Sequence, residues 1–219
     1  MDYACQNEHE DSVYYIITQT KCQLVKEEKS QVLFLGCSLG NLKLICYMFE
    51  SYNCTIEDCI TKESSLLHCA CQFGHKDIVK FLIKKMGFNP QIRDRDQRTP
   101  LHYACQYGHP FTASFLLSQG CSTEVKDHHQ LTPVNYACLY GQTTVVNSLI
   151  NSKHIYASDP FVECFLTHTS EHIPHLVHLA YQYGQLDLLK YMFAELKWNV
   201  YIQNAVSYTH LTLPTIYAV

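Results

Sequence analysis

Histidine and cysteine are the side chains in this sequence whose chemistry could support catalysis or metal binding. The 219 residues include 13 His and 12 Cys, which in principle could supply a Cys–His nucleophilic pair or a zinc site. His172, His175 and His178 have helical spacing, but no Cys or carboxylate is clearly placed to complete four ligands, and no Cys-x-x-Cys pair occurs. We therefore expect no metal site, no catalytic residue and no cofactor.

Other signatures of enzymes, and those of nucleic-acid or membrane binding, are weak. The sequence has no Gly-rich phosphate loop and no kinase signature set. Its net charge is −4, and its 16 Lys and Arg are scattered along the chain. No apolar stretch reaches the roughly 18 residues of a membrane span. These features predict a protein that is not an enzyme and that binds no nucleic acid, membrane interior or small-molecule substrate.

Several of the cysteines belong to an internal repeat. Five stretches share one template, with their cysteines 32, 34, 34 and 33 residues apart, and a sixth, weaker copy begins 43 residues after the fifth. A period near 33 indicates that each unit is one supersecondary element, which buries its apolar face only by stacking on its neighbours. The copies are Tyr3–Gln6, Gly36–Gly40, Ala70–His75, Ala104–His109, Ala137–Gly141 and Ala180–Gly184.

The repeated cysteine has a structural explanation. It directly follows the small residue of the template, where helices stack closely and a small apolar side chain is needed, and free Cys behaves as one. Reduced, structural cysteines fit an intracellular protein better than a secreted, disulfide-linked one. The expected location is therefore intracellular, in the cytoplasm.

The unit at 94–120 indicates how the template folds. Thr99 is a natural helix N-cap, and Pro100 occupies the first helical position, where its missing N–H costs nothing. Apolar residues then recur at i, i+3 and i+4, and Gly108 ends this short helix. A second helix follows, and polar, turn-prone segments join one unit to the next.

These residues resemble those of the ankyrin repeat family. The stretch Thr99-Pro100-Leu101-His102-x-Ala104 matches the family's Thr-Pro-Leu-His-x-Ala signature, Gly108-His109 matches its Gly-His pair, and partial matches keep this phase over about residues 3–204. The resemblance implies an all-α repeat, an ankyrin solenoid of about six helix-turn-helix units with short β-hairpin or turn fingers. It also implies that the signature histidines knit neighbouring repeats together through backbone hydrogen bonds, and these are His68, His102 and His178.

The template divides residues 1–205 into repeat units and one insertion. The units are expected at about 1–28, 29–60, 61–93, 94–126, 127–152 and 170–204, and an insertion at 153–169 accounts for the long gap. Gln97 and Gln130 stand where the family commonly has Gly, so we expect strained or differently shaped finger turns there.

In the ankyrin family, partners usually bind the concave side formed by the fingers and the first helix of each pair. The two variable positions after each small-residue–Cys pair therefore predict a contact row in which Tyr gives stiff contact area with a polar tip. The alternative is that this row packs under the fingers. The predicted binding residues are Gln72, Phe73, Gln106, Tyr107, Leu139, Tyr140, Gln182 and Tyr183 on the helices, and Arg95, Asp96, Arg98, His128 and His129 on the fingers.

The sequence leaves more than one function open. The first hypothesis is a non-catalytic scaffold that binds another protein through the concave face of the array. The alternative is a targeting or regulatory segment of a larger enzyme or channel, cut at both ends, because Met1 falls inside a repeat. A third, a small zinc or redox protein, would be supported by stoichiometric metal after purification.

The last residues do not follow the repeat. The stretch from Val206 to Thr215 resembles the in-frame translation of a sequencing adapter. Residues 206–219 are therefore expected to lie outside the natural protein and to have no part in its function.

Removal of residues 206–219 should leave the helical content and the melting temperature essentially unchanged, because a segment that fits no repeat has no stacking partner. Circular dichroism melts of the full and shortened chains test this expectation. A loss of several degrees on removal would contradict it, since about 1 kcal/mol shifts the melting temperature of a chain this size by about 2–4 °C.

Overall fold

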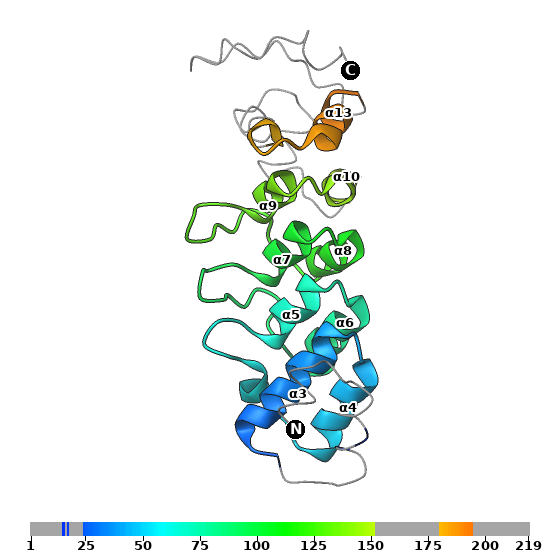
Figure 1. Cartoon of the computed structure of the whole chain (residues 1–219), viewed down its shortest axis with the longest axis vertical. Coiled ribbons are helices and arrows are strands. Elements are labelled where there is room, and N and C mark those ends of the chain that lie inside the picture. The colour runs from blue at the N-terminus through cyan, green and yellow to red at the C-terminus, as the bar shows by residue number, and fades with distance from the viewer. Residues whose placement is uncertain (1–14, 16, 18–23, 152–179, 195–219) are drawn as a thin grey trace.

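A computed structural model describes residues 15, 17, 24–151 and 180–194, which form a stack of short helices (Figure 1). Within these residues, no helix is long and apolar enough to cross a membrane. The predicted insertion at 153–169, the tail at 206–219 and His172, His175 and His178 lie outside the described residues.

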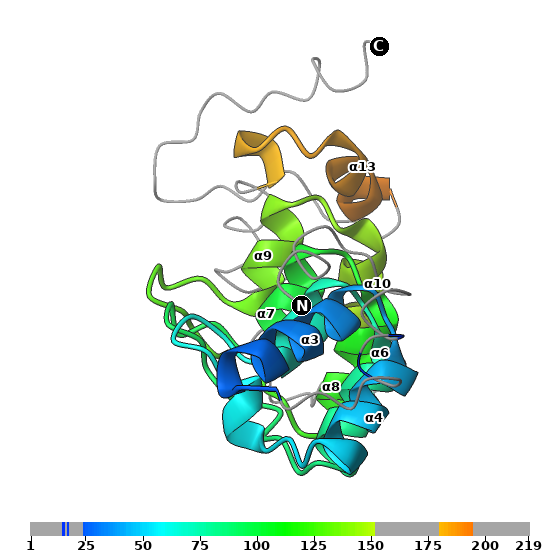
Figure 2. The same ribbon diagram turned by 60° about the horizontal axis from the view of Figure 1, so that its bottom comes forward.

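The helices form pairs, and the pairs stack in two columns (Figures 1 and 2). First helices contact first helices along one column, and second helices contact second helices along the other. The prediction of an all-α repeat is thereby confirmed. The elements are α3 (Lys26–Ser38) with α4 (Leu42–Ser51), the 3-10 helix η1 (Ile56–Cys59), α5 (Leu66–Gln72) with α6 (Lys76–Lys84), α7 (Pro100–Gln106) with α8 (Pro110–Ser118), α9 (Pro133–Leu139) with α10 (Thr143–Asn151), and α13 (Leu186–Ala194).

The first helices of the central units begin where the sequence predicts. Thr99 and Thr132 are N-caps with extended backbone, and each is followed by proline at the first helical position. The third helical residue completes each cap, because its side chain accepts a hydrogen bond from the N–H of the cap residue. Asn135 shows the arrangement, with Oδ1 2.9 Å from the Thr132 amide nitrogen.

Helix α3 is longer than its equivalents because it lacks this start signal. Gln31-Val32-Leu33-Phe34 replaces the Thr-Pro-Leu-His segment, so no proline fixes the first turn. The helix instead begins at Lys26, after the N-cap Val25. The Val25 amide donates to the Glu28 carboxylate over 3.0 Å, which supplies the side-chain half of a capping box.

The turn between paired helices requires glycine. Gly74 has φ +73° and Gly108 has φ +79°, a region that L side chains rarely adopt. A Cβ on Gly74 would also run into the His109 imidazole of the next unit. Glycine therefore both forms the turn and allows the next repeat to approach.

The core runs continuously from unit to unit. Leu101, Ala104 and Cys105, the predicted apolar face of one first helix, are all fully buried. Each second helix adds buried aliphatic residues, such as Leu82 and Leu116. Because a single helix pair cannot enclose this surface, each unit depends on its neighbours for burial.

The fingers are turns that project from the first-helix column (Figure 1). In one finger the Asp94 amide donates to the Arg98 carbonyl over 2.9 Å, and in the next the Asp127 amide donates to the Leu131 carbonyl over 3.0 Å. The part of the chain that the structure describes has no β-strand, and its isolated antiparallel bridge joins Ile60 to Ser65.

The two finger glutamines have the unusual backbone that the sequence suggested. Gln97 has φ +64° and Gln130 has φ +61°. For a residue with a Cβ, this left-handed conformation costs about 1–2 kcal/mol, and glycine avoids that cost. The expectation of strained finger turns is therefore met at both positions.

Gln97→Gly and Gln130→Gly should each raise the free energy of unfolding by about 0.5–1 kcal/mol, because relief of the left-handed strain exceeds the extra chain entropy of glycine. Urea denaturation measures the change. Gln119→Gly is the matched control, because Gln119 has φ −92°. That variant should lose stability, and a gain there as large as at Gln97 would contradict the explanation.

Candidate functional site

The fingers and the first helices α5, α7 and α9 form one side of the stack, which we call the finger-side face (Figures 1 and 2). The second helices α6, α8 and α10 lie along the other side. The finger-side face corresponds to the side predicted to be concave. All thirteen predicted binding residues lie within the described residues.

A row of exposed aromatic side chains follows this face, and we call it the aromatic ladder. Phe73, Tyr107 and Tyr140 are the C-cap residues of α5, α7 and α9. Tyr183 directly follows the helical residues 180–182 and precedes another left-handed glycine. Their exposed fractions are 45%, 43%, 51% and 56%, respectively. The ladder is therefore open to solvent rather than buried under the fingers.

In the units of α7 and α9, a second ring stacks on the ladder side chain and orients it. Tyr107 stacks on Tyr103, with ring centroids 6.4 Å apart and planes 12° from parallel. Tyr140 stacks on Tyr136 in the same way, at 6.3 Å and 7°. These pairs are four residues apart on one helix, where side chains meet. The ladder thus presents rings that are already oriented.

The residues beside the ladder are less exposed. Gln72, Gln106 and Leu139 are half-buried, whereas Gln182 is exposed. The Gln106 side-chain oxygen Oε1 is buried and has no hydrogen-bond partner among the described residues. Leaving a buried acceptor of this kind unpaired is costly to stability.

The charged finger residues are paired within the array. Arg95 and Glu63 of the preceding finger form an exposed ion pair at 3.0 Å. Arg98 bonds Asp94 at 3.0 Å and Asp96 at 3.1 Å. Its guanidinium also lies 4.8 Å from the centre of the Tyr103 ring. Arg95, Asp96 and Arg98 therefore shape the fingers as well as bordering the ladder.

The two adjacent finger histidines expose their side chains. The His128 amide donates to the Asp96 carbonyl of the preceding finger over 3.0 Å. The His129 amide donates to Asp127 Oδ1 over 2.8 Å. Backbone bonds thus hold this finger in place, while both imidazoles remain on the surface.

Two buried aspartates anchor the fingers, and the sequence analysis did not identify them. Asp94 accepts a hydrogen bond from the Tyr103 hydroxyl over 2.9 Å, and Asp127 accepts one from Tyr136 over 2.7 Å. Burial raises the pKa of Asp127, but bonds from Tyr136 and from backbone amides outweigh it and leave that pKa below its usual value. Their sequence signal is an Asp followed nine residues later by Tyr, repeated after 33 residues.

The two signature histidines within the described residues, His68 and His102, bridge neighbouring repeats, as predicted. His102 Nδ1 accepts a hydrogen bond from the Thr99 amide at 3.0 Å, and its Nε2 donates to the Leu131 carbonyl of the next finger at 3.2 Å. His68 makes the same pair of bonds, and its Nε2 donates to the Arg98 carbonyl at 3.1 Å. Burial lowers the pKa of His102 to about 4, so the imidazole is neutral at pH 7.

A second set of bonds between repeats ends on carbonyls beside the ladder. His109 Nε2 donates to the Gln72 carbonyl over 2.8 Å, and His75 makes the equivalent bond to Ser38 over 3.0 Å. Glutamines take this role in later repeats. Gln142 Nε2 donates to the Gln106 carbonyl over 3.0 Å, and Gln185 Nε2 to the Leu139 carbonyl over 2.9 Å. The sequence analysis missed both glutamines, although each follows the repeat glycine as His does.

The described cysteines are structural. Cys37, Cys71, Cys105 and Cys138 are fully buried and unpaired at the predicted stacking position. Burial raises the pKa of the Cys138 thiol to about 12, which makes it a poor nucleophile at neutral pH. The described residues contain no group of three or more His, Cys, Asp or Glu that could hold a metal ion.

Gly36-Cys37-Ser38-Leu39-Gly40 has the Gly-x-Ser-x-Gly spacing of a hydrolase nucleophile, which the sequence analysis did not recognise. The structure places it at the end of α3 rather than on a turn between strand and helix. The Ser38 hydroxyl donates to the Leu35 carbonyl over 2.9 Å, and His75 bonds the Ser38 backbone instead of its hydroxyl. Nothing in this geometry activates the serine.

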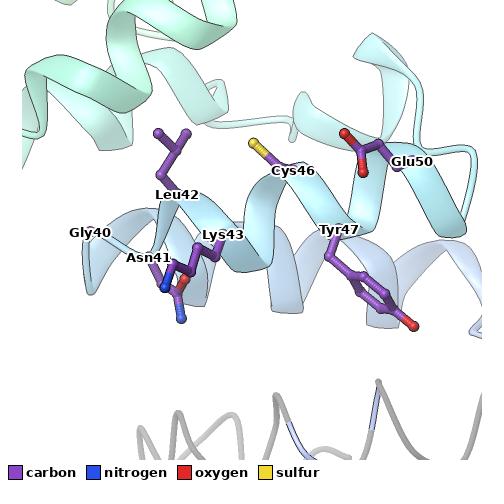
Figure 3. A pocket seen from close by; sticks show the side chains of 7 residues that line it. All are labelled: Gly40, Asn41, Leu42, Lys43, Cys46, Tyr47 and Glu50. Atoms are coloured by element: carbon purple, nitrogen blue, oxygen red, sulfur yellow. The ribbon is translucent and has the colours of Figure 1, made fainter.

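A shallow pocket lies along α4, away from the finger-side face (Figure 3). Its lining comes from α4 and the two residues before it, and the side chains do not converge on a common point. Burial raises the pKa of the Cys46 thiol in this pocket. The lining is therefore unsuited to catalysis, and its residues are Gly40, Asn41, Leu42, Lys43, Cys46, Tyr47 and Glu50.

Comparisons with known proteins support the repeat assignment. A family model described as ankyrin repeats, in three copies, matches residues 33–127 and again residues 67–162. Together these matches cover more than half of the chain. No match was found among the curated proteins.

The bridge made by His102 should make stability depend on pH. Its pKa is about 4 in the folded chain and about 6.5 when unfolded, so the unfolded chain binds more protons between these values. The stabilisation from the neutral imidazole is complete above about pH 6.5 and is lost as the pH falls toward 4. In His102→Asn, urea denaturation at pH 7 should show a loss of about 1–3 kcal/mol, and this difference from the natural chain should shrink at pH 4–5.

Asparagine is the informative replacement because Asn135 makes the same cap bond in the neighbouring unit. His128→Asn is the control, since its imidazole is exposed and makes no bridge. A difference between His102→Asn and the natural chain that stays constant from pH 7 to pH 4 would contradict the bridge as the source of the pH dependence.

Proposed function

Because the chain belongs to the ankyrin repeat family, whose repeats are generally protein–protein interaction modules and typically non-catalytic, we propose that it is a protein-interaction scaffold. It binds another protein through the concave, finger-side face. The aromatic ladder supplies the central contacts, and the fingers supply the rim. No catalytic role is assigned to any of its residues.

The observation that carries this proposal is the exposure of the ladder. Four aromatic side chains at the same repeat position leave about half of their surface in solvent, although three of them, Phe73, Tyr107 and Tyr140, lie next to a fully buried Ala-Cys pair. Tyrosine in such a setting offers a large contact area at low entropic cost and a hydroxyl for hydrogen bonding. Contiguous exposed aromatic surface on a folded protein is typical of an interaction site.

The rigidity of the face also supports the proposal. Hydrogen bonds from Tyr103 to Asp94 and from Tyr136 to Asp127 anchor two fingers. The bonds from His109 and Gln142 hold the backbone beside Phe73 and Tyr107. A face that is already ordered loses little conformational entropy on binding, which leaves more of the contact energy for affinity.

The proposed contacts divide into a centre and a rim. Central contacts are expected to contribute most of the binding energy, and rim charges to affect association rate and selectivity. The proposed centre is Gln72, Phe73, Gln106, Tyr107, Leu139, Tyr140, Gln182 and Tyr183, and the proposed rim is Arg95, Asp96, Arg98, His128 and His129.

Tyr107→Ala and Tyr140→Ala should each weaken binding of a partner recovered by affinity capture by about 2 kcal/mol or more, because interface tyrosines are frequent hot spots. Titration calorimetry measures the affinity, and a thermal melt measures the stability of the same variants. Stability should fall less than affinity, because both side chains are about half exposed.

Two controls separate binding from folding. Leu101→Ala creates a core cavity and should cost roughly 2–5 kcal/mol of stability. Phe111→Ala removes an aromatic that is 75% exposed on α8, in the second-helix column, and should leave both quantities unchanged. If the tyrosine variants bind normally or melt as early as Leu101→Ala, the ladder is structural and the proposal fails.

A further inference from the structure

We propose that the segment of the partner that occupies the aromatic ladder is a proline-rich peptide in the polyproline II conformation. This inference rests on the proposed function. It adds the chemical class and conformation of the bound segment, with one residue in every three contacting one ladder aromatic.

The spacing of the ladder favours this conformation. Helices α5, α7 and α9 pack directly on one another, and packed helices lie roughly 8–10 Å apart. Equivalent residues on them, such as Phe73, Tyr107 and Tyr140, therefore repeat at about that interval. A polyproline II helix has three residues per turn and rises about 3.1 Å per residue, so every third residue returns to the same side after about 9.3 Å. A β-strand returns to the same side after about 6.6–6.8 Å and would lose register with the ladder.

Unused hydrogen-bonding groups beside the ladder favour an extended peptide over a helix. Among the described residues, the side-chain N–H groups of Gln72 and Gln106 donate no hydrogen bond, whereas the backbone carbonyls of both residues accept one from the next repeat. A polyproline II backbone has no internal hydrogen bonds, so its carbonyls can accept hydrogen bonds from these side-chain N–H groups. An α-helix repeats a heptad position after about 10.5 Å, which is compatible with the ladder, but its backbone groups are already bonded to one another.

The ring geometry and the charge of the face are suited to the same ligand. The parallel rings of Tyr103 with Tyr107 and of Tyr136 with Tyr140 form a series of oriented aromatic surfaces. Aromatic-lined grooves with polar donors are the general means of binding proline-rich segments. The bordering arginines are occupied by Glu63, Asp94 and Asp96. Arg95 and Arg98 are therefore not free to bind an acidic peptide, which favours an uncharged one.

Fluorescence anisotropy with the full chain tests this proposal. The probe is a labelled oligoproline of about twelve residues, long enough to reach four ladder positions. A Gly-Ser peptide of equal length and an amphipathic Ala-rich helical peptide with Leu at every seventh residue are the comparison probes. Oligoproline should bind at least about tenfold more tightly than either. Tyr107→Ala and Tyr140→Ala should each weaken it by about tenfold, the scale of a lost aromatic contact.

Phe111→Ala is the matched control, because it removes an exposed aromatic outside the ladder. Gln106→Ala should weaken the oligoproline by several-fold without lowering the melting temperature. The proposal is overturned if oligoproline binds no better than the Gly-Ser peptide, if the helical peptide binds more tightly, or if Phe111→Ala has as large an effect as Tyr107→Ala. Should a captured partner depend on Tyr107 and Tyr140 while oligoproline does not bind, the proposed function stands and this inference fails.

Discussion

In the central repeats, the hydrogen bonds of a buried, neutral histidine, His68 or His102, hold each helix start and the next finger in place. His102 receives a hydrogen bond from the start of its own helix and donates one to a carbonyl of the next finger. One side chain therefore satisfies a helix terminus and fixes the position of the neighbouring repeat. Because the imidazole is buried between the two, it must remain uncharged. Helix start, finger position and stacking are consequently determined together.

The array tolerates substitutions that keep the donor or acceptor each position needs. Asn135 replaces the signature histidine and retains the oxygen that accepts the cap hydrogen bond. Gln142 and Gln185 replace the histidine that follows the turn glycine, and each retains an N–H that reaches the preceding repeat. The repeats thus preserve hydrogen-bonding chemistry where they do not preserve residue type.

Much of the fold was predictable because its signals are local. The period, the Thr-Pro helix starts, the turn glycines and the buried Ala-Cys pair are all read within one repeat. The roles of Gln142 and Gln185 were missed because their partners are set by tertiary packing, whereas the buried Asp94 was missed although its partners Arg98 and Tyr103 lie in its own unit. Gln185, for example, bonds a carbonyl 46 positions away. The early start of α3 was missed because it results from the absence of a proline. The aromatic row could be located from its spacing, but only the packed structure gives the exposure and parallel rings that make it a candidate binding surface.

The bonds from His75, His109, Gln142 and Gln185 also determine how the molecule would respond to mechanical tension. Each interface holds only the two repeats it joins, so a pulling force along the stack acts on the interfaces in series, and every one of them carries the full load. Extension would therefore proceed one junction at a time, beginning at the weakest. Opening the interface between two repeats would move neighbouring ladder residues too far apart for one bound segment to contact both. Under the proposed function, tension along the stack would therefore weaken binding of a segment that spans the ladder.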